Sequence, residues 1–186
     1  IQSDICSTLI KKGINVLCFN QRSISEILNV IKFLGKIIDK RDKSENYVQN
    51  LENYLKKIAS SSKSLNKKPR VYFEEWNEPM ITGIKWVSEL IEIAGGIDIF
   101  KNLSSEPLAS DRIIQDPQDI LKANPDIIIA SWCGKKVNKE KIKTRNKWDK
   151  IRAVKDNQIY EIKSPLILQP GPAALTDGLD EIQDII

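Results

Sequence analysis

One stretch, residues 70–100 (RVYFEEWNEPMITGIKWVSELIEIAGGIDIF), constrains the fold of this chain more than any other. Residues 70–73 form a short apolar run of strand-forming types, and Pro79 ends regular pairing because it lacks a backbone donor. After Gly83 the apolar side chains take the helical spacing i, i+4, i+7, and Gly95-Gly96 supplies a left-handed stop. A strand, a loop and a helix in this order place the loop at the carboxyl edge of a parallel sheet, where open α/β folds bind ligands.

Two later stretches repeat this order. Residues 125–130 (PDIIIA) read as a buried strand followed by the loop SWCGKK, and residues 158–163 (QIYEIK) read as a strand followed by a proline-rich loop and a helix. We therefore expect three loops at one edge of a sheet. The candidate ligand-binding side chains of these loops are Glu74, Glu75, Trp76, Trp132, Cys133, Ser164 and Gln169. Trp86, at the start of the helix after Gly83, fits either the core or the ligand site.

Glycines, prolines, capping residues and apolar spacing elsewhere in the chain predict further elements. They are a helix over 4–12, a strand over 14–19, a helix over 25–34 that stops at Gly35, and short helices over 117–123 and 139–145. Ser23 and Glu26 have the spacing of a capping box. Residues 42–62 lack glycine and proline and carry apolar side chains at helical spacing, which predicts a helical rod of about 30 Å that could bridge two lobes. Trp148 is expected to anchor its segment in the core.

Composition excludes several classes of function. The chain has no histidine, which rules out a Ser-His-Asp triad, a Cys-His pair and a histidine zinc site on these 186 residues. The net charge of +4 comes with scattered lysines that lack interleaved aromatics, so solvated surface is favoured over nucleic-acid binding. No apolar run approaches the ~20 residues of a membrane span. Phosphate-binding signatures are absent, because the Cys-Gly-Lys-Lys of residues 133–136 lacks the P-loop glycine and hydroxyl.

The three cysteines give no metal or disulfide framework. They have no CxxC spacing and their number is odd. Cys18 lies in the predicted strand and is expected to be a small core residue. Cys133 follows a strand beside two lysines, which could lower its pKa, but a lone thiol without a base is a poor catalyst. A plain loop residue and a ligand contact both stay open for Cys133.

The motifs FEEW…GIKWVSELIEIAGG, NPDIIIASWCGKK and IYEIKSPLILQPGPAALTDGLDE together resemble the C-terminal lobe of vitamin B12 (cobalamin) binding proteins. These are class III periplasmic substrate-binding proteins of ABC transporters for corrinoids, haem and ferric siderophores. The resemblance continues more weakly upstream and covers nearly the whole chain. It implies an α/β fold of two Rossmann-like lobes joined by a long helix, with a partial N-terminal lobe over 1–42, the interlobe helix and linker over 43–68, and the C-terminal lobe over 69–186. The first part of the N-terminal lobe is missing, and the expectation is a fragment.

The resemblance also implies a function. We expect a non-catalytic binding component that holds no cofactor or metal of its own, carries cobalamin or a related corrinoid as the transported ligand, and delivers it to an ABC permease. A periplasmic or extracytoplasmic location is implied, although the chain shows no signal peptide. Family members dock through an acidic residue on each lobe. Gln118 occupies the place of that acid here, so Asp116 or Asp119 could replace it.

Tryptophan rings would cover the flat face of a corrinoid, while Ser164 and Gln169 would bond its polar rim. Glu74, Glu75 and Glu78 would repel anionic haem or catecholate siderophores and tolerate the neutral amides of cobalamin, which favours a corrinoid unless nearby lysines reverse the charge balance. Haem and siderophore binding, a degenerate paralogue that binds nothing, and a cysteine-dependent enzyme remain alternatives. An incomplete first lobe also predicts self-association through uncovered apolar surface.

Overall fold

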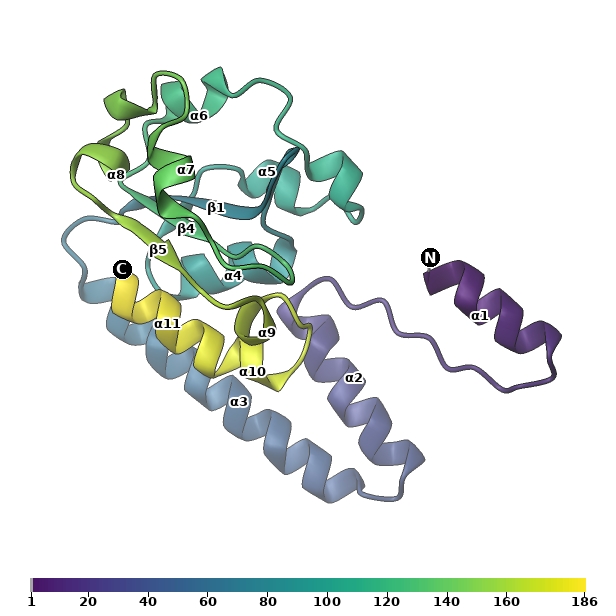
Figure 1. Ribbon diagram of the computed structural model, residues 1–186. Helices are drawn as coiled ribbons and strands as arrows, with labels where there is room; N and C mark the ends of the chain where they lie inside the picture. Colours follow the sequence, from purple (N-terminus) through teal and green to yellow (C-terminus); the bar gives the residue numbers. More distant parts are fainter. Residues whose placement is uncertain (1) are drawn as a thin grey trace.

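A computed structural model describes residues 2–186 and shows a mixed α/β fold, so the predicted class is confirmed (Figure 1). The strands are β1 (Arg70–Asn77), β2 (Met80–Thr82), β3 (Ile97–Asp98), β4 (Ile127–Ala130) and β5 (Ile159–Glu161). The longer helices are α1 (Gln2–Lys11), α2 (Ile24–Ile37), α3 (Arg41–Ser61), α4 (Lys85–Ile93) and α11 (Asp177–Ile185). The short helices are α5 (Lys101–Ser104), α6 (Gln118–Ala123), α7 (Lys139–Lys143), α8 (Arg152–Lys155), α9 (Ser164–Ile167) and α10 (Pro172–Leu175). Single 3₁₀ turns are η1 (Ser62–Ser64), η2 (Ala109–Arg112) and η3 (Trp148–Lys150).

The sheet has the order β2-β1-β4-β5, and β3 pairs with the first residues of β1. β1, β3, β4 and β5 are parallel, while β2 folds back on β1 as an antiparallel hairpin. Val71 pairs with Ile127 and Glu74 with Ala130, and Ala130 in turn pairs with Glu161. The carboxyl ends of the three main strands therefore meet at one edge, as the three strand-loop units predicted.

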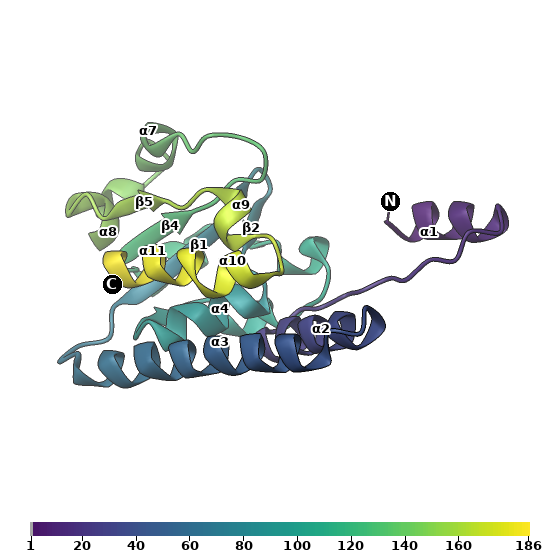
Figure 2. The same cartoon turned by 90° about the horizontal axis from the view of Figure 1, so that it is seen from below.

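Each face of the sheet has its own hydrophobic cluster, because side chains alternate along a strand. Phe73 and Ile129 point into a cluster shared with α2, α3, α4 and α11. Tyr72 and Ile128 point into the opposite cluster, where the buried ring of Trp148 packs against Tyr72 at 6.2 Å between centroids. Trp148 is thus the core anchor that the sequence predicted. Figure 2 shows α3 and α4 stacked on one side of the sheet and α7 on the other.

Helices α2 and α3 form an antiparallel hairpin that packs on the first of these faces. Ser23 caps α2 as predicted, since its hydroxyl accepts from the Glu26 backbone N at 3.3 Å and the Glu26 carboxylate accepts from the Ser23 N at 3.0 Å. α3 is the predicted rod. The predicted stop at Gly35 is wrong, because α2 continues to Ile37. Gly35 instead permits close packing: a Cβ at this position would lie 2.0 Å from the Ser44 Oγ.

Two other expectations need correction. No strand occurs over residues 14–19; this segment is extended and has no neighbouring strand to pair with in the described chain. Cys18 is accordingly exposed rather than buried in a core. β1 is also longer than predicted, because its second half pairs with β2, so residues 74–77 are strand rather than loop. Among the described helices, none is long and apolar enough to cross a membrane.

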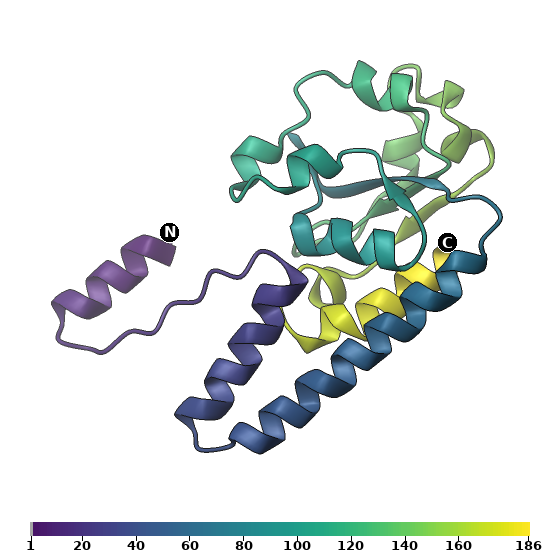
Figure 3. The same ribbon diagram turned by 180° about the vertical axis from the view of Figure 1, so that it is seen from behind.

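The N-terminal segment, residues 2–19, extends away from the remaining structure in all three views (Figure 3). At its end the ring of Phe19 contacts that of Phe33 in α2, with 5.7 Å between centroids. The large apolar side chains of this segment are exposed, among them Ile5, Ile10, Leu17 and Phe19. None of the residues described before Ser23 is buried. The predicted division of the chain into lobes at 42 and 68 stays a prediction, and the structure adds that α2 and α3 share one core with the sheet.

Candidate functional site

Glu74 lies at the centre of a buried polar network under the carboxyl edge of the sheet. Its carboxylate is fully buried and receives Arg145 in a two-point ion pair, Nη1 to Oε2 at 2.5 Å and Nη2 to Oε1 at 2.9 Å. Trp132 Nε1 donates to Oε1 and the Tyr72 hydroxyl to Oε2, both at 3.0 Å. Burial disfavours the charged form of Arg145, but the hydrogen bonds and charge of Glu74 outweigh it and raise the arginine pKa. Burial also raises the pKa of Tyr72 well above its usual value. Glu74 therefore fixes the side chains of Tyr72, Trp132 and Arg145 relative to one another beneath the edge of the sheet.

The other two acids are also paired. Arg112, which is almost fully buried, donates to both carboxylate oxygens of Glu75 at 2.6 and 3.2 Å. Glu78 pairs with Lys141 at 2.7 Å, and the hydrogen bond and charge of that lysine lower the pKa of Glu78. The expectation that the three acids present unpaired negative charge at this edge therefore needs correction, and which ligands the edge repels stays a prediction. That expectation treated the carboxylates as unpaired, whereas each has a cationic partner from a later part of the chain.

The four tryptophans divide between core and edge. Trp132 is buried in the second hydrophobic cluster rather than displayed on a loop, because its N–H bonds to Glu74. Trp86 is buried in the first cluster, and its Nε1 donates to the Ile167 carbonyl at 2.9 Å. This residue therefore packs in the core and also holds α4 against α9 at the edge of the sheet. Trp76 alone of the three candidate tryptophans is half-exposed. The ammonium of Lys135 stands 3.8 Å from the centre of its ring and donates to the Asn77 Oδ1 at 2.6 Å.

Two cavities open beside these residues at the carboxyl edge. The lysine pocket, of about 520 Å³, lies at the ends of β4 and β5. Its lining residues are Trp132, Gly134, Lys135, Lys136, Glu161, Ile162, Lys163, Ser164 and Pro165. The Glu161 carboxylate accepts from the Val137 backbone N at 3.0 Å. Three lysines and one glutamate line this pocket, so its lining carries net positive charge.

The arginine pocket, of about 280 Å³, lies between the end of β1 and the start of α4. Its lining residues are Arg22, Glu75, Ile84, Trp86, Pro107, Leu108, Ala109, Arg112 and Leu168. The Nε atoms of Arg22 and Arg112 are buried and have no hydrogen-bond partner among the described residues. Buried donors of this kind cost free energy unless a partner satisfies them, so this pocket is suited to an anionic or acceptor-rich group.

Of the other predicted ligand residues, one lines a pocket and two do not. Ser164 lines the lysine pocket at the start of α9. Cys133 is exposed next to this pocket but is not one of its lining residues. Gln169 is exposed and lines neither pocket. Of the predicted residues, Trp132 and Ser164 therefore line the lysine pocket, and Glu75 and Trp86 line the arginine pocket. Glu74 lines neither pocket and is buried beneath the edge.

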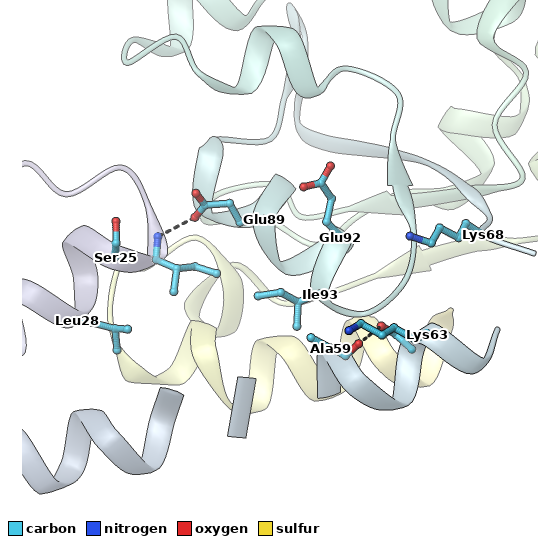
Figure 4. Close-up of a pocket in the computed structure, with 10 residues that line it drawn as sticks. Ser25, Leu28, Ala59, Lys63, Lys68, Glu89, Glu92 and Ile93 are labelled. Atoms are coloured by element: carbon cyan, nitrogen blue, oxygen red, sulfur yellow. Dashed lines mark hydrogen bonds between the residues drawn. The ribbon is translucent and has the colours of Figure 1, made fainter. Parts of the chain in front are cut away.

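A further cavity, of about 790 Å³, lies elsewhere, between α2, the end of α3 and α4 (Figure 4). Apolar side chains such as Leu28 and Ile93 line it together with the charged Lys63 and Glu92. None of the predicted site residues lines this cavity. No cluster of three or more metal-ligating side chains occurs in residues 2–186.

The predicted docking residues lie at the start of α6. Asp116 Oδ1 accepts from the Gln118 backbone N at 2.9 Å, and Asp119 pairs with Lys122 at 3.0 Å. Both carboxylates are at the exposed surface, with Gln118 between them. This geometry leaves the choice between the two acids open.

Sequence reasoning missed four cationic residues of the site: Arg22, Arg112, Lys135 and Arg145. Arg112 pairs with Glu75 across 37 positions and Arg145 with Glu74 across 71 positions. Local sequence patterns do not predict such pairs, although Arg145 lies at the end of the predicted helix over 139–145. Only Lys135 carried a signal, because it directly follows a strand-loop junction at the predicted edge.

Several curated proteins are similar to this chain in sequence. The chain is 26% identical to the uncharacterized ABC transporter substrate-binding lipoprotein YvrC of Bacillus subtilis over 99% of its length and 57% of that protein. It is 23% identical to the high-affinity heme uptake system protein IsdE of Staphylococcus aureus over 85% of its length and 53% of that protein. The chain thus spans a little over half the length of these curated relatives.

Solved structures show the same fold. Staphylococcus aureus IsdE complexed with heme superposes with a TM-score of 0.82 at 18% identity, covering 100% of this chain and 73% of that one. The periplasmic vitamin B12 binding protein BtuF of Vibrio cholerae gives a TM-score of 0.69 at 18% identity, covering 98% and 69%. The family described as periplasmic binding protein matches residues 2–166. Because this match takes in most of the chain, the chain belongs to the periplasmic binding protein family.

Proposed function

We propose that this chain is the ligand-binding part of an extracytoplasmic substrate-binding protein that serves an ABC importer and catalyses no reaction itself. The family supports this, as does the likeness to YvrC, which is described as a substrate-binding lipoprotein. The ligand would lie against the carboxyl edge of the sheet and the loaded protein would dock on a permease. Asp116 and Asp119 at the start of α6 are the proposed docking acids on this lobe.

The proposed ligand is a large metal chelate or macrocycle that carries anionic groups, such as haem or a ferric catecholate siderophore. The observation that carries this choice is the charge of the edge. All three acids have cationic partners, while the lysine pocket keeps Lys135, Lys136 and Lys163 and the arginine pocket keeps two unsatisfied guanidinium N–H groups. Complementary charge of this kind steers an anionic ligand and selects against cationic ones.

A cobalamin-type corrinoid is the second candidate. The half-exposed ring of Trp76 favours it, since an indole can cover part of a flat apolar macrocycle, and the Ser164 hydroxyl and Gln169 amide offer neutral partners for rim amides. For this ligand Lys135 would have to leave the face of Trp76. Haem and cobalamin share the flat apolar face, so the charge of the rim discriminates between them.

The test is a titration of the purified chain with hemin, a ferric catecholate siderophore and cyanocobalamin, followed by tryptophan fluorescence. The anionic ligands should quench saturably. Lys163→Gln should weaken their binding about fivefold, on the ~1 kcal/mol scale of an exposed charge contact, whereas Lys155→Gln on the exposed end of α8 serves as the matched control and should have no effect.

Trp76→Ala should weaken any macrocycle by about tenfold, as expected for a buried aromatic contact of ~1–2 kcal/mol. Saturable binding of cyanocobalamin alone would replace the anionic ligand by the corrinoid. Absence of saturable binding for all three ligands would overturn the importer assignment and leave a paralogue that folds without binding.

A further inference from the structure

The N-terminal segment folds back on itself although it lacks contacts with the hydrophobic core. α1 ends with Gly13 at φ +74°, where the Gly13 N donates to the Ile10 carbonyl at 2.9 Å and the Ile14 N donates to the Leu9 carbonyl at 3.1 Å. Such a left-handed closure reverses the chain direction at a helix end. The extended residues 14–19 therefore return beside α1, as Figures 1 and 2 show.

This reversal brings two thiols together. The Sγ atoms of Cys6, in α1, and Cys18, in the returning segment, lie 2.6 Å apart. Cys6 is half-buried and Cys18 is exposed, so reagents in solution can reach the pair. Cys133 follows β4, and no other thiol of the described chain lies within bonding distance of it. The structure thus divides three cysteines into one close pair and one separate thiol.

We propose that Cys6 and Cys18 form an intramolecular disulfide that ties α1 to residues 14–19, while Cys133 remains a free thiol. The inference does not depend on the proposed ligand or importer. It supplies a covalent link within a segment that has no buried apolar contacts of its own. It also assigns a modification to two residues for which the odd cysteine count gave no pairing.

The reaction is a thiol–disulfide exchange with a disulfide oxidant, such as oxidised glutathione. The thiolate of one cysteine attacks a sulfur of the oxidant, breaks its S–S bond and releases one thiol. The thiolate of the second cysteine then attacks the resulting mixed disulfide, forms the Cys6–Cys18 bond and releases the second thiol. The two cysteines lose two protons and two electrons, and the oxidant is reduced to two thiols. The hydrogen bond from Cys6 raises the pKa of Cys18, so the exchange should accelerate as the pH rises above neutral.

The experiment treats the reduced full chain with oxidised glutathione and counts free thiols after denaturation. The count should fall from three to one per chain once glutathione adducts are excluded by mass. Trypsin cleaves after Lys11, Lys12 and Arg22, so the peptides that carry Cys6 and Cys18 should appear covalently linked. Cys133→Ser should lose both remaining thiols, whereas Cys18→Ser should give no intramolecular link.

Because the two cysteines are only 12 positions apart, an unfolded chain could also join them. The same oxidation is therefore repeated in urea, and the native chain should form the link severalfold faster. Equal rates in both conditions, glutathione adducts on Cys6 and Cys18 in place of the link, a link through Cys133, or a link found only between chains would each overturn the proposal.

Discussion

Replacing Glu74 by alanine should severely destabilise the fold. The substitution removes the acceptor of two Arg145 nitrogens, the Trp132 N–H and the Tyr72 hydroxyl in one step, and leaves a guanidinium of 16% side-chain exposure without its counter-charge. Breaking a buried ion pair from one side costs about 3–5 kcal/mol. Since a typical domain unfolds at a cost of roughly 5–15 kcal/mol, this is a large share of its stability.

Urea unfolding followed by tryptophan fluorescence measures the effect, because Trp132 itself reports on the network. For a chain of this size about 3–5 kcal/mol corresponds to a loss of roughly 6–20 °C in thermal midpoint. Glu74→Gln keeps the shape and one acceptor oxygen, so its loss should be smaller. Glu140→Ala is the control: its exposed pair with Lys143, at 2.8 Å, should contribute less than about 1 kcal/mol. A Glu74→Ala protein within 1 kcal/mol of the original would show that this network does not support the edge.

Three further predictions concern the surface and the buried acid outside the site. Burial raises the pKa of Asp98, so its contribution to stability is present at low pH and is lost as the pH rises through the folded pKa. Asp98→Asn should therefore remove this pH dependence of urea unfolding, which sets in as the pH rises above about 4, and an unchanged pH profile would contradict it. Exposed apolar side chains on α2, such as Phe33 at 44% exposure, should make the chain self-associate; light scattering should show a dimer that Phe33→Lys weakens, and a monomer at all concentrations would reject this. Replacing Asp116 and Asp119 by asparagine should weaken binding to the cognate permease without changing ligand affinity, whereas Glu140→Gln on α7 should not; unaltered permease binding in the double variant would remove α6 from the docking surface.

Local signals in the sequence predicted the main strands, the helices that follow them along the chain, and the common edge of the sheet. Short apolar strands followed by loops marked the edge, and Ser23 and Gly95 marked helix ends where backbone chemistry demands them. The sequence could not show that residues 74–77 pair with β2, because that pairing depends on a hairpin closed by residues 78–79. The predicted strand over 14–19 is absent because strand-forming residues need a neighbouring strand with which to pair, and this segment has none among the described residues.

The site was only partly predictable, because its electrostatics depend on partners distant in the sequence. Glu74 and Arg145 are 71 positions apart, and Glu75 and Arg112 are 37 apart. Nothing in the pattern around an acid at a strand end shows that a guanidinium from another segment will neutralise it. The positions of the candidate residues were therefore more predictable than the sign of the charge they present.

The hydrogen bond from the Trp86 indole to the Ile167 carbonyl joins the start of α4 to the end of α9. Trp86 itself and Leu168, the residue after α9, line one side of the arginine pocket. Widening the pocket on this side would require breaking a buried hydrogen bond and moving a tryptophan out of the core. If the proposed ligand binds here, this side of the pocket is already in its final shape, and binding would lose little affinity to reordering of the protein. Adaptation to ligands of different size would then fall to mobile side chains at the rim, with the ammonium of Lys135 over Trp76 as the movable part.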